Sequence, residues 1–333
     1  MSKENKHTID DLRTMQDWSL ARKIQVAQTR IVEWYHRYNG KVCVNFSGGK
    51  DSTVLLDLAR RCFPDIPAVY IDTGLEYPEV RKFAVSMPNV TVVKPAIRFD
   101  EVIKKYGWCF PSKEIGETIW YARKFITSVN LKRLEDVGVC KYPLGTKYLW
   151  SVSRLQGLTN DGTYSKFRQR YKKWAFLLDA PFIISSKCCD VMKIEPLTRY
   201  QKETGNMHIV GTMASESNRR QQSWLRVGCN AFDTDDPASK PLSFWLEQDI
   251  LRYLHEFNIS YASVYGDIVQ DKKGKYQTTG EKRTGCVFCP IGCHRDKVNK
   301  FQRLKITHPK LYDYCIKDLG LGDVLDYVGV SYE

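Results

Sequence analysis

Residues 42–53 combine the side chains and the backbone freedom that hold a phosphate group. Val42, Val44 and Phe46 alternate as in a β-strand, and Ser-Gly-Gly-Lys-Asp-Ser then leads into a helix expected at 52–61. Adjacent glycines allow a tight turn without Cβ atoms, so backbone N–H groups, two hydroxyls and one ammonium can face one anion. The predicted anion site consists of Ser47, Gly48, Gly49, Lys50, Asp51 and Ser52.

Lys50 and Asp51 give this loop its expected chemistry. The motif differs from the GxxxxGK[ST] loop of kinases and GTPases, because its glycines are adjacent and Asp51 follows the lysine. The Lys50 ammonium would neutralise phosphate or sulfate oxygens. Two roles stay open for Asp51: hydrogen bonding to backbone N–H groups of the loop, or contact with a metal ion such as Mg²⁺. We expect both residues to be catalytic.

Four cysteines form a second group that could do chemistry. Cys188 and Cys189 are adjacent, and Cys286 and Cys289 form a C-x-x-C pair. Thiolates bind iron–sulfur clusters and zinc, and a C-x-x-C turn presents two of them to one metal centre. Eleven cysteines in a chain expected in the reducing cytoplasm favour metal or redox chemistry over disulfides. Cys293 could replace either member of the adjacent pair.

Alternating strands and helices must position these residues. One or two leading helices are expected at 9–38, where apolar residues recur at helical spacing. The expected strands are 41–46, 67–71, 90–93 and 207–211. This order favours an α/β fold, in which helices cover both faces of a parallel sheet. Ligands of such sheets bind beyond the carboxyl ends of the strands, where the glycine-rich loop falls.

Residues 141–175 form a basic and aromatic segment within an irregular stretch at 112–182. Eight lysines and arginines stand there against the single acid Asp161, in a chain whose net charge is +13. Seven aromatic residues alternate with the cations, as in grooves that bind single-stranded nucleic acid. Two interpretations stay open: a nucleic-acid surface, or a solvated insertion whose aromatic side chains pack on the core.

Several motifs resemble known proteins. SGGKDS at 47–52 resembles the PP-loop of the ATP pyrophosphatases. AVYIDTGLEYPEV at 68–80, HIVGTMASESNRR at 208–220 and the Trp-containing stretch at 241–265 resemble the phosphoadenosine phosphosulfate reductase family. The resemblance implies a Rossmann-like, doubly wound parallel sheet of the PP-loop ATP pyrophosphatase type. It also implies an adenine nucleotide, which is ATP, adenylyl sulfate or phosphoadenylyl sulfate.

The resemblance adds two loops to the expected nucleotide site. The further residues that it implies are Asp72, Thr73, Gly74, Gly211, Glu216, Arg219 and Arg220. Asp72 has two interpretations, a contact with ribose or adenine and a plain helix N-cap. Arg219 and Arg220 fit an anion clamp, because a guanidinium can bind two oxygens at once. Arg220 is expected to be catalytic.

The cysteines resemble the quartet of the assimilatory adenylyl-sulfate reductases. That resemblance implies a [4Fe-4S] cluster held by Cys188, Cys189, Cys286 and Cys289. A structural zinc site on the same four residues is the alternative.

The end of the sequence departs from the reductases. They carry a Glu-Cys-Gly-(Leu/Ile)-His tail whose cysteine attacks the sulfate, whereas this sequence ends in DYVGVSYE. Cys315, the nearest cysteine, is expected to be a half-buried helix residue.

Three functions therefore stay open. The first is ATP hydrolysis at the α-phosphate coupled to sulfur transfer, which resembles the reactions of tRNA thiolases and of DNA phosphorothioation. The second is sulfonucleotide reduction. The third is a regulatory role in which the protein binds a nucleotide without turnover. An adenine nucleotide is the expected partner, together with either a sulfur donor or a thioredoxin-like reductant. Nucleic acid is a further partner under the first interpretation of 141–175.

Composition predicts the setting of the protein and the sequence predicts its domains. The mean hydropathy of −0.42 and the lack of an apolar run behind the N-terminal charges favour a cytoplasmic protein without a membrane partner. A nucleotide domain is expected at 1–265, including the basic insertion at 112–182. A C-terminal region with the C-x-x-C pair and helices is expected at 266–333.

Overall fold

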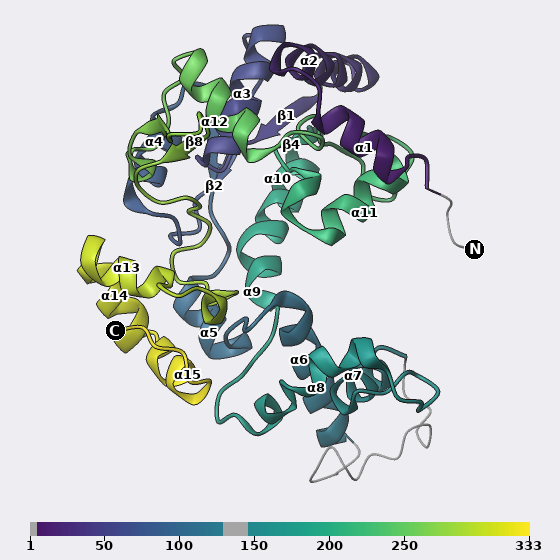
Figure 1. The fold of residues 1–333 in the computed structure, drawn as a ribbon, viewed down its shortest axis with the longest axis vertical. Coiled ribbons are helices and arrows are strands. Elements are labelled where there is room, and N and C mark those ends of the chain that lie inside the picture. The colour runs from purple at the N-terminus through teal and green to yellow at the C-terminus, as the bar shows by residue number, and fades with distance from the viewer. Residues whose placement is uncertain (1–4, 129–145) are drawn as a thin grey trace. The chain divides into compact units, whose positions relative to one another are not determined.

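The computed structural model describes residues 5–128 and 146–333, which form two compact units (Figure 1). Unit 1 comprises Met1–Pro95 and Glu195–Val287. Unit 2 comprises Ala96–Ile194 and Phe288–Glu333. The expected domain division at residue 265 stays a prediction.

A six-stranded sheet forms the centre of unit 1. Its strand order is β3-β2-β1-β4-β6-β5, and all neighbours pair in parallel except β5 with β6. The strands are β1 (Val42–Asn45), β2 (Ala68–Ile71), β3 (Val90–Val93), β4 (Met207–Val210), β5 (Asn230–Ala231) and β6 (Ala238–Ser239). The sheet confirms the predicted α/β class, and the four expected strands lie within one residue of their predicted ends.

Side chains on alternate positions of β1 point to opposite faces of this sheet. Val42 and Val44 join the main core, whereas Cys43 packs with Val69 and Tyr200 in a smaller cluster. This alternation is the period-two geometry of a strand that is covered on both sides. The main core also takes residues from α1 (Ile9–Gln16), α2 (Leu20–Arg37), α3 (Lys50–Cys62), α4 (Pro78–Ser86), α11 (Asn218–Val227) and α12 (Glu247–Glu256). Tyr200 belongs to α10 (Glu195–Thr204) on the other face.

Of the one or two leading helices expected at 9–38, the structure has two. The Ser19 side chain accepts a hydrogen bond from the Arg22 N–H and caps α2, which separates it from α1. Short elements complete unit 1. They are the 3₁₀ turns η5 (Ala214–Glu216) and η6 (Ser263–Tyr265) and the antiparallel hairpin of β7 (Ile268–Gln270) and β8 (Tyr276–Thr278).

Unit 2 is helical in its described residues. Its first segment contains α5 (Phe99–Tyr106), α6 (Lys113–Ser128), α7 (Thr146–Gln156), η2 (Lys166–Arg168), α8 (Gln169–Lys172), η3 (Ala175–Asp179), α9 (Lys187–Cys189) and η4 (Asp190–Ile194). Its second segment contains η7 (Cys293–Arg295), α13 (Lys300–Thr307), α14 (Pro309–Asp313), η8 (Tyr314–Asp318) and α15 (Leu321–Tyr327). The Arg123 guanidinium of α6 donates to the carbonyl oxygens of Leu177, Leu178, Ala180 and Phe182. It thereby fixes the end of η3 and the irregular stretch after it.

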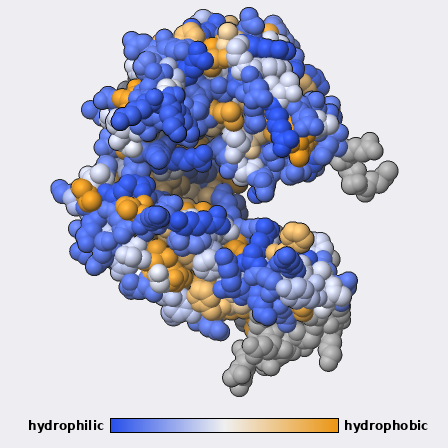
Figure 2. All heavy atoms as spheres, viewed as in Figure 1, coloured by the Kyte–Doolittle hydropathy of each residue, from blue (hydrophilic) through white to orange (hydrophobic). Residues whose placement is uncertain are grey.

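Hydrophilic residues cover most of the face shown in Figure 2. Among the described residues, no helix has the length and apolar character needed to cross a membrane.

Candidate nucleotide site and thiol group

The glycine-rich loop of unit 1 connects β1 to α3 in a conformation that requires its first glycine. Gly48 has a φ of +71°, and a Cβ atom there would lie 2.9 Å from the Val80 carbonyl oxygen. Gly49 is the N-cap of α3 and offers no side-chain oxygen to the first N–H groups of that helix. The loop therefore leads into a helix N-terminus without a side-chain cap, which is a favourable place for an anion.

Hydroxyl groups hold the loop in shape. The Ser52 hydroxyl accepts from the Ser47 N–H at 3.1 Å and donates to the Gly49 carbonyl oxygen at 2.9 Å. The two serine hydroxyls are also 3.0 Å apart. Because these bonds close the turn on itself, the cradle is formed without a ligand.

The Lys50 side chain is 5% exposed and has two partners within unit 1. Its Nζ lies 2.9 Å from Glu247 Oε1 and donates to the Lys282 carbonyl oxygen at 2.5 Å. Burial works to raise the pKa of Glu247, and the hydrogen bond and charge of Lys50 outweigh it, so the pKa lies below its usual value. A carboxylate thus balances the lysine charge where a phosphate is expected.

Asp51 lies next to this ion pair with one unsatisfied oxygen. Its Oδ1 is buried and has no hydrogen-bond partner among the described residues. Burial raises the pKa of Asp51, while the charges of Lys50 and Arg283 oppose that rise. An orphaned carboxylate oxygen fits a bound cation, so this atom suits the Mg²⁺ contact better than the backbone hydrogen bond.

The second loop follows β2 and differs from one expectation. Asp72 accepts three hydrogen bonds from the Arg81 guanidinium, at 3.0, 3.1 and 2.9 Å. The N-cap interpretation of Asp72 is wrong, because α4 begins after Tyr77 and has no side-chain cap. The Thr73 hydroxyl donates to Glu76 Oε1 at 2.7 Å, and Gly74 has a φ of +72°.

The third loop follows β4. Glu216 accepts from the Met213 N–H at 2.9 Å and forms an ion pair with Arg220. Burial lowers the pKa of Arg220, and the charge of Asp51 acts in the opposite direction. Arg219 is exposed, and a Cβ atom on Gly211 would lie 3.2 Å from the Asp51 carbonyl oxygen.

Strand order explains why the three loops converge. β2, β1 and β4 are adjacent parallel strands, as Figure 1 shows, and each of the three loops leaves the carboxyl end of one of them. Sequence reasoning missed Glu247, Tyr265 and the 282–284 stretch. Their positions more than 190 residues beyond the loop carry no local signal for this role.

The thiols of unit 2 form a group around α9. Cys188 is hydrogen-bonded to Cys109 and Cys189, and Lys113 is hydrogen-bonded to Cys189. The bond with Cys109 is the main cause that raises the pKa of Cys188 to about 12, and burial adds to it. Sequence reasoning missed Cys109, since it stands alone in GWCFPS. Its neighbours are set by the backbone pairing of Trp108 with Ile183 and Ser185.

The predicted quartet is divided in the chain between the two units. Cys188, Cys189 and Cys289 belong to unit 2, whereas Cys286 lies near the end of unit 1. Cys293 is 3% exposed. No group of three or more His, Cys, Asp or Glu side chains within 5–128 and 146–333 is arranged to hold a metal ion. The donor chemistry of several adjoining thiols still fits an iron–sulfur cluster or zinc.

Residues 41–134 and 149–297, more than half of the chain, match the model of the phosphoadenosine phosphosulfate reductase domain family. The chain belongs to this family. Its members are sulfonucleotide reductases or related PP-loop enzymes.

Three relatives illustrate the range of the similarity. An uncharacterized protein of Methanocaldococcus jannaschii is 22% identical over 304 residues, which cover 87% of this chain and 51% of that protein. Sulfate adenylyltransferase subunit 2 of Pseudoalteromonas translucida is 22% identical over 224 residues, which cover 66% of this chain and 59% of that protein. Phosphoadenosine 5′-phosphosulfate reductase of a Synechococcus species is 25% identical over 127 residues, which cover 36% of this chain and 55% of that protein. The chain spans about half the length of these curated relatives.

The basic insertion of this reductase-family chain contains exposed side chains and side chains that bond to or pack against other residues of the protein. Tyr164 and Phe167 are 71% and 87% exposed, and Lys166, Lys172 and Lys173 are exposed. In contrast, Arg168 donates to Leu158 and Asn160, Arg170 pairs with Glu114, and Trp174 packs against Phe110 and His294. Lys141 and Tyr142 lie outside the described residues. Among the described residues of 141–175, an exposed basic and aromatic surface therefore lies at 164–173, and Trp150 is also 41% exposed.

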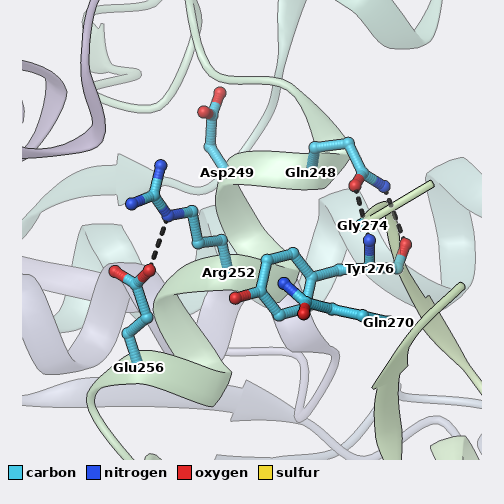
Figure 3. A pocket seen from close by; sticks show the side chains of 7 residues that line it. All are labelled: Gln248, Asp249, Arg252, Glu256, Gln270, Gly274 and Tyr276. Atoms are coloured by element: carbon cyan, nitrogen blue, oxygen red, sulfur yellow. Dashed lines mark hydrogen bonds and ion pairs between the residues drawn. The ribbon is translucent and has the colours of Figure 1, made fainter. Parts of the chain in front are cut away.

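Figure 3 shows a polar pocket of about 430 Å³ between α12 and the β7–β8 hairpin. Its polar groups satisfy one another: Arg252 pairs with Glu256 at 2.7 Å, and the Gln248 amide bonds both backbone groups of Tyr276. Asp249 is also engaged, since it accepts from Lys23 at 2.6 Å. The contacts of these pocket residues hold α12 in place. Glu247, the first residue of α12, is thereby positioned to reach Lys50.

Proposed function

We propose that this chain is an iron–sulfur PP-loop enzyme that hydrolyses ATP at the α-phosphate and couples the adenylation to sulfur transfer. The observation that carries the proposal is the preformed cradle of residues 47–52, with buried Lys50 at its centre. Kinship with a sulfate adenylyltransferase subunit supports the ATP assignment. The exposed basic surface at 164–173 supports nucleic acid as the sulfur acceptor, and the proposed setting is the reducing cytoplasm.

The loops divide the work of binding and charge stabilisation. The N–H groups of the loop and the Lys50 ammonium would bind phosphate oxygens, and Arg220 would bind a second group of oxygens. Asp51 would hold Mg²⁺ through its unsatisfied oxygen, and this ion would offset the charge on the departing pyrophosphate. Asp72, Thr73 and Gly74 would contact the nucleoside. The attacking oxygen of the acceptor would form a bond to the α-phosphorus. At the same time the bond between the α-phosphorus and the oxygen that bridges it to the β-phosphorus would break, and pyrophosphate would leave.

We further propose a [4Fe-4S] cluster on Cys188, Cys189, Cys286 and Cys289, with zinc as the alternative. When bound, the cluster would supply a site for sulfur. The adjoining Cys188, Cys189 and Cys109 support a thiol-bound group in unit 2, and Cys109 competes with the predicted ligands. Lys113 would balance the negative charge of the thiolates. Iron analysis of anaerobically prepared Cys109→Ser and Cys286→Ser proteins separates the two ligand sets.

Sulfonucleotide reduction is the second candidate, and membership of the reductase family favours it. The reaction needs an accessible thiolate to attack the sulfate. Cys315 does not supply one, because it is fully buried in η8 rather than half-buried, and burial raises the pKa of its thiol. A reductase of this kind would take its nucleophile from a thioredoxin-like partner. A regulatory relative without turnover is the third candidate.

One assay distinguishes these candidates. Anaerobically purified protein is incubated with ATP, adenylyl sulfate or phosphoadenylyl sulfate, with and without thioredoxin and nucleic acid. We expect pyrophosphate from ATP, with AMP released when water or a sulfur nucleophile attacks the adenylated acceptor. Sulfite release from a sulfonucleotide, with ATP left intact, would instead make the chain a reductase, and nucleotide binding without any product would make it a regulator.

A further inference from the structure

Residues 279–287 are tied to the glycine-rich loop and to the second loop of unit 1. The Lys282 carbonyl oxygen accepts from Lys50 Nζ, and the Thr284 hydroxyl lies 3.0 Å from the Tyr265 hydroxyl, which in turn accepts from the Lys50 N–H at 3.4 Å. The Val287 N–H donates to the Leu75 carbonyl oxygen at 2.7 Å. These bonds fix the backbone on both sides of Arg283.

Close packing at Gly280 adds to this anchoring. Its N–H donates to the Tyr265 carbonyl oxygen at 2.8 Å, and a Cβ atom there would lie 2.4 Å from the Val264 carbonyl oxygen. The Glu281 N–H donates to the same Val264 oxygen at 3.0 Å. The segment therefore enters the nucleotide site along a fixed path.

Arg283 is surrounded by the charged groups of the site. Its charge acts on Asp51, on Glu247 and on Arg220, and its neighbours Lys282 and Thr284 are bonded to Lys50 and Tyr265, so Arg283 is held within electrostatic range of the site. The side chain is exposed and forms no hydrogen bond or ion pair with a described residue. A cation held beside another cation, without a carboxylate of its own, is poised to bind an anion.

Two other cations of the site have protein partners. Lys50 is paired with Glu247, and Arg220 is paired with Glu216. An incoming phosphate must compete with these carboxylates, whereas Arg283 can bind it at once.

We propose that Arg283 is a further phosphate-binding residue of the nucleotide site, presented by residues 279–287. The inference rests on the proposed nucleotide function and extends it to a residue outside the three loops. Because Arg283 stands three positions before Cys286, the same segment joins phosphate binding to the first thiol of the C-x-x-C pair.

Calorimetric titration with ATP and with inorganic tripolyphosphate tests the proposal. We expect Arg283→Ala to weaken tripolyphosphate binding about tenfold or more, since charge-assisted hydrogen bonds are among the stronger ones. Arg283→Lys should recover part of the loss, because it keeps the charge but not the paired donors. Arg13→Ala is the matched control, an exposed arginine of unit 1 on α1, and should bind as the wild type does.

The two ligands separate this proposal from the proposed function. An Arg283→Ala protein that binds tripolyphosphate with wild-type affinity would overturn the role of Arg283, whatever ATP does. Wild-type protein that binds ATP no more tightly than tripolyphosphate would contradict the adenine site. In that case the difference in tripolyphosphate affinity between the wild type and Arg283→Ala would still decide whether Arg283 binds phosphate. Wild-type protein that binds neither ligand would overturn both.

Hydrogen exchange gives a second measurement. Tripolyphosphate should slow exchange in the peptide covering 281–287 of the wild type and leave it unchanged in Arg283→Ala. Equal protection in both proteins would contradict the proposal, since the segment would then respond without its arginine.

Discussion

The nucleotide loops of unit 1 and the thiols of unit 2 are built in different ways. The loops leave adjacent parallel strands, so the sheet brings them to one edge, and each loop is closed by its own hydrogen bonds. The thiols come from short helical turns and from a stretch between α5 and α6, and one tertiary backbone pairing sets Cys109 among them. A preformed site is therefore expected in unit 1, whereas the proposed metal group of unit 2 is expected to fix the arrangement of its thiols.

The largest effect is expected at the thiols. Cys188→Ser should abolish the cluster, so that anaerobically prepared protein falls from about four irons per chain to almost none. Cys62→Ser is the matched control, because that thiol is in unit 1 at the end of α3 and should keep all iron. Iron analysis and visible absorption measure the result. Wild-type protein that is colourless and holds one zinc would refute the cluster and favour the zinc alternative.

The next effect concerns the cradle of unit 1. Lys50→Ala should weaken ATP binding by roughly 1.5 to 3 kcal/mol, or about ten- to a hundredfold, because it removes a charge-assisted phosphate contact. Iron content should not change, since the cradle folds without a ligand. Calorimetry of Lys50→Ala beside Lys41→Ala, an exposed lysine before β1, makes the comparison. Equal ATP affinity in the two variants would show that the cradle does not bind the nucleotide.

Acidification should weaken the sheet of unit 1. His208 on β4 lies 3.3 Å from the Cys43 sulfur, and burial lowers its pKa to about 4. The unfolded chain, with an ordinary histidine pKa of 6.5, then binds more protons than the folded one below that pH. The stabilisation is complete above pH 6.5 and is lost as the pH falls, by roughly 2 kcal/mol between pH 6.5 and 5.

Denaturation at several pH values tests this expectation. His208→Gln should flatten the dependence over that window. A variant whose stability falls with pH as steeply as that of the wild type would assign the effect to other groups.

The smallest effect is expected at the 164–173 surface of unit 2. Glutamate at Lys166, Lys172 and Lys173 should reduce the slope of log affinity against log salt for single-stranded nucleic acid, by about 0.7 for each lost phosphate contact. ATP affinity should persist. Arg168→Ala is the contrasting variant, because that side chain bonds Leu158 and Asn160. A salt slope unaffected by the three reversals would favour the solvated insertion.

The sequence predicted unit 1 better than unit 2 for a physical reason. A strand, two glycines and a helix start are consecutive residues, so their pattern identifies the loop and its fold together. Glu247, Arg283 and Cys109 reach their neighbours only through tertiary packing, and none has a local signature. Asp72 shows the same limit, because its partner Arg81 could not be distinguished in sequence from the other surface cations of its helix.

The products made from ATP test the central claim most directly. Anaerobic protein with its iron, ATP, Mg²⁺, nucleic acid and sulfide as the sulfur donor can be followed by phosphorus NMR, because sulfide must displace AMP from the adenylated acceptor. Attack at the α-phosphate predicts AMP and pyrophosphate in equal amounts, with formation lost in Lys50→Ala. ADP and orthophosphate, or intact ATP beside sulfite released from adenylyl sulfate, would contradict it.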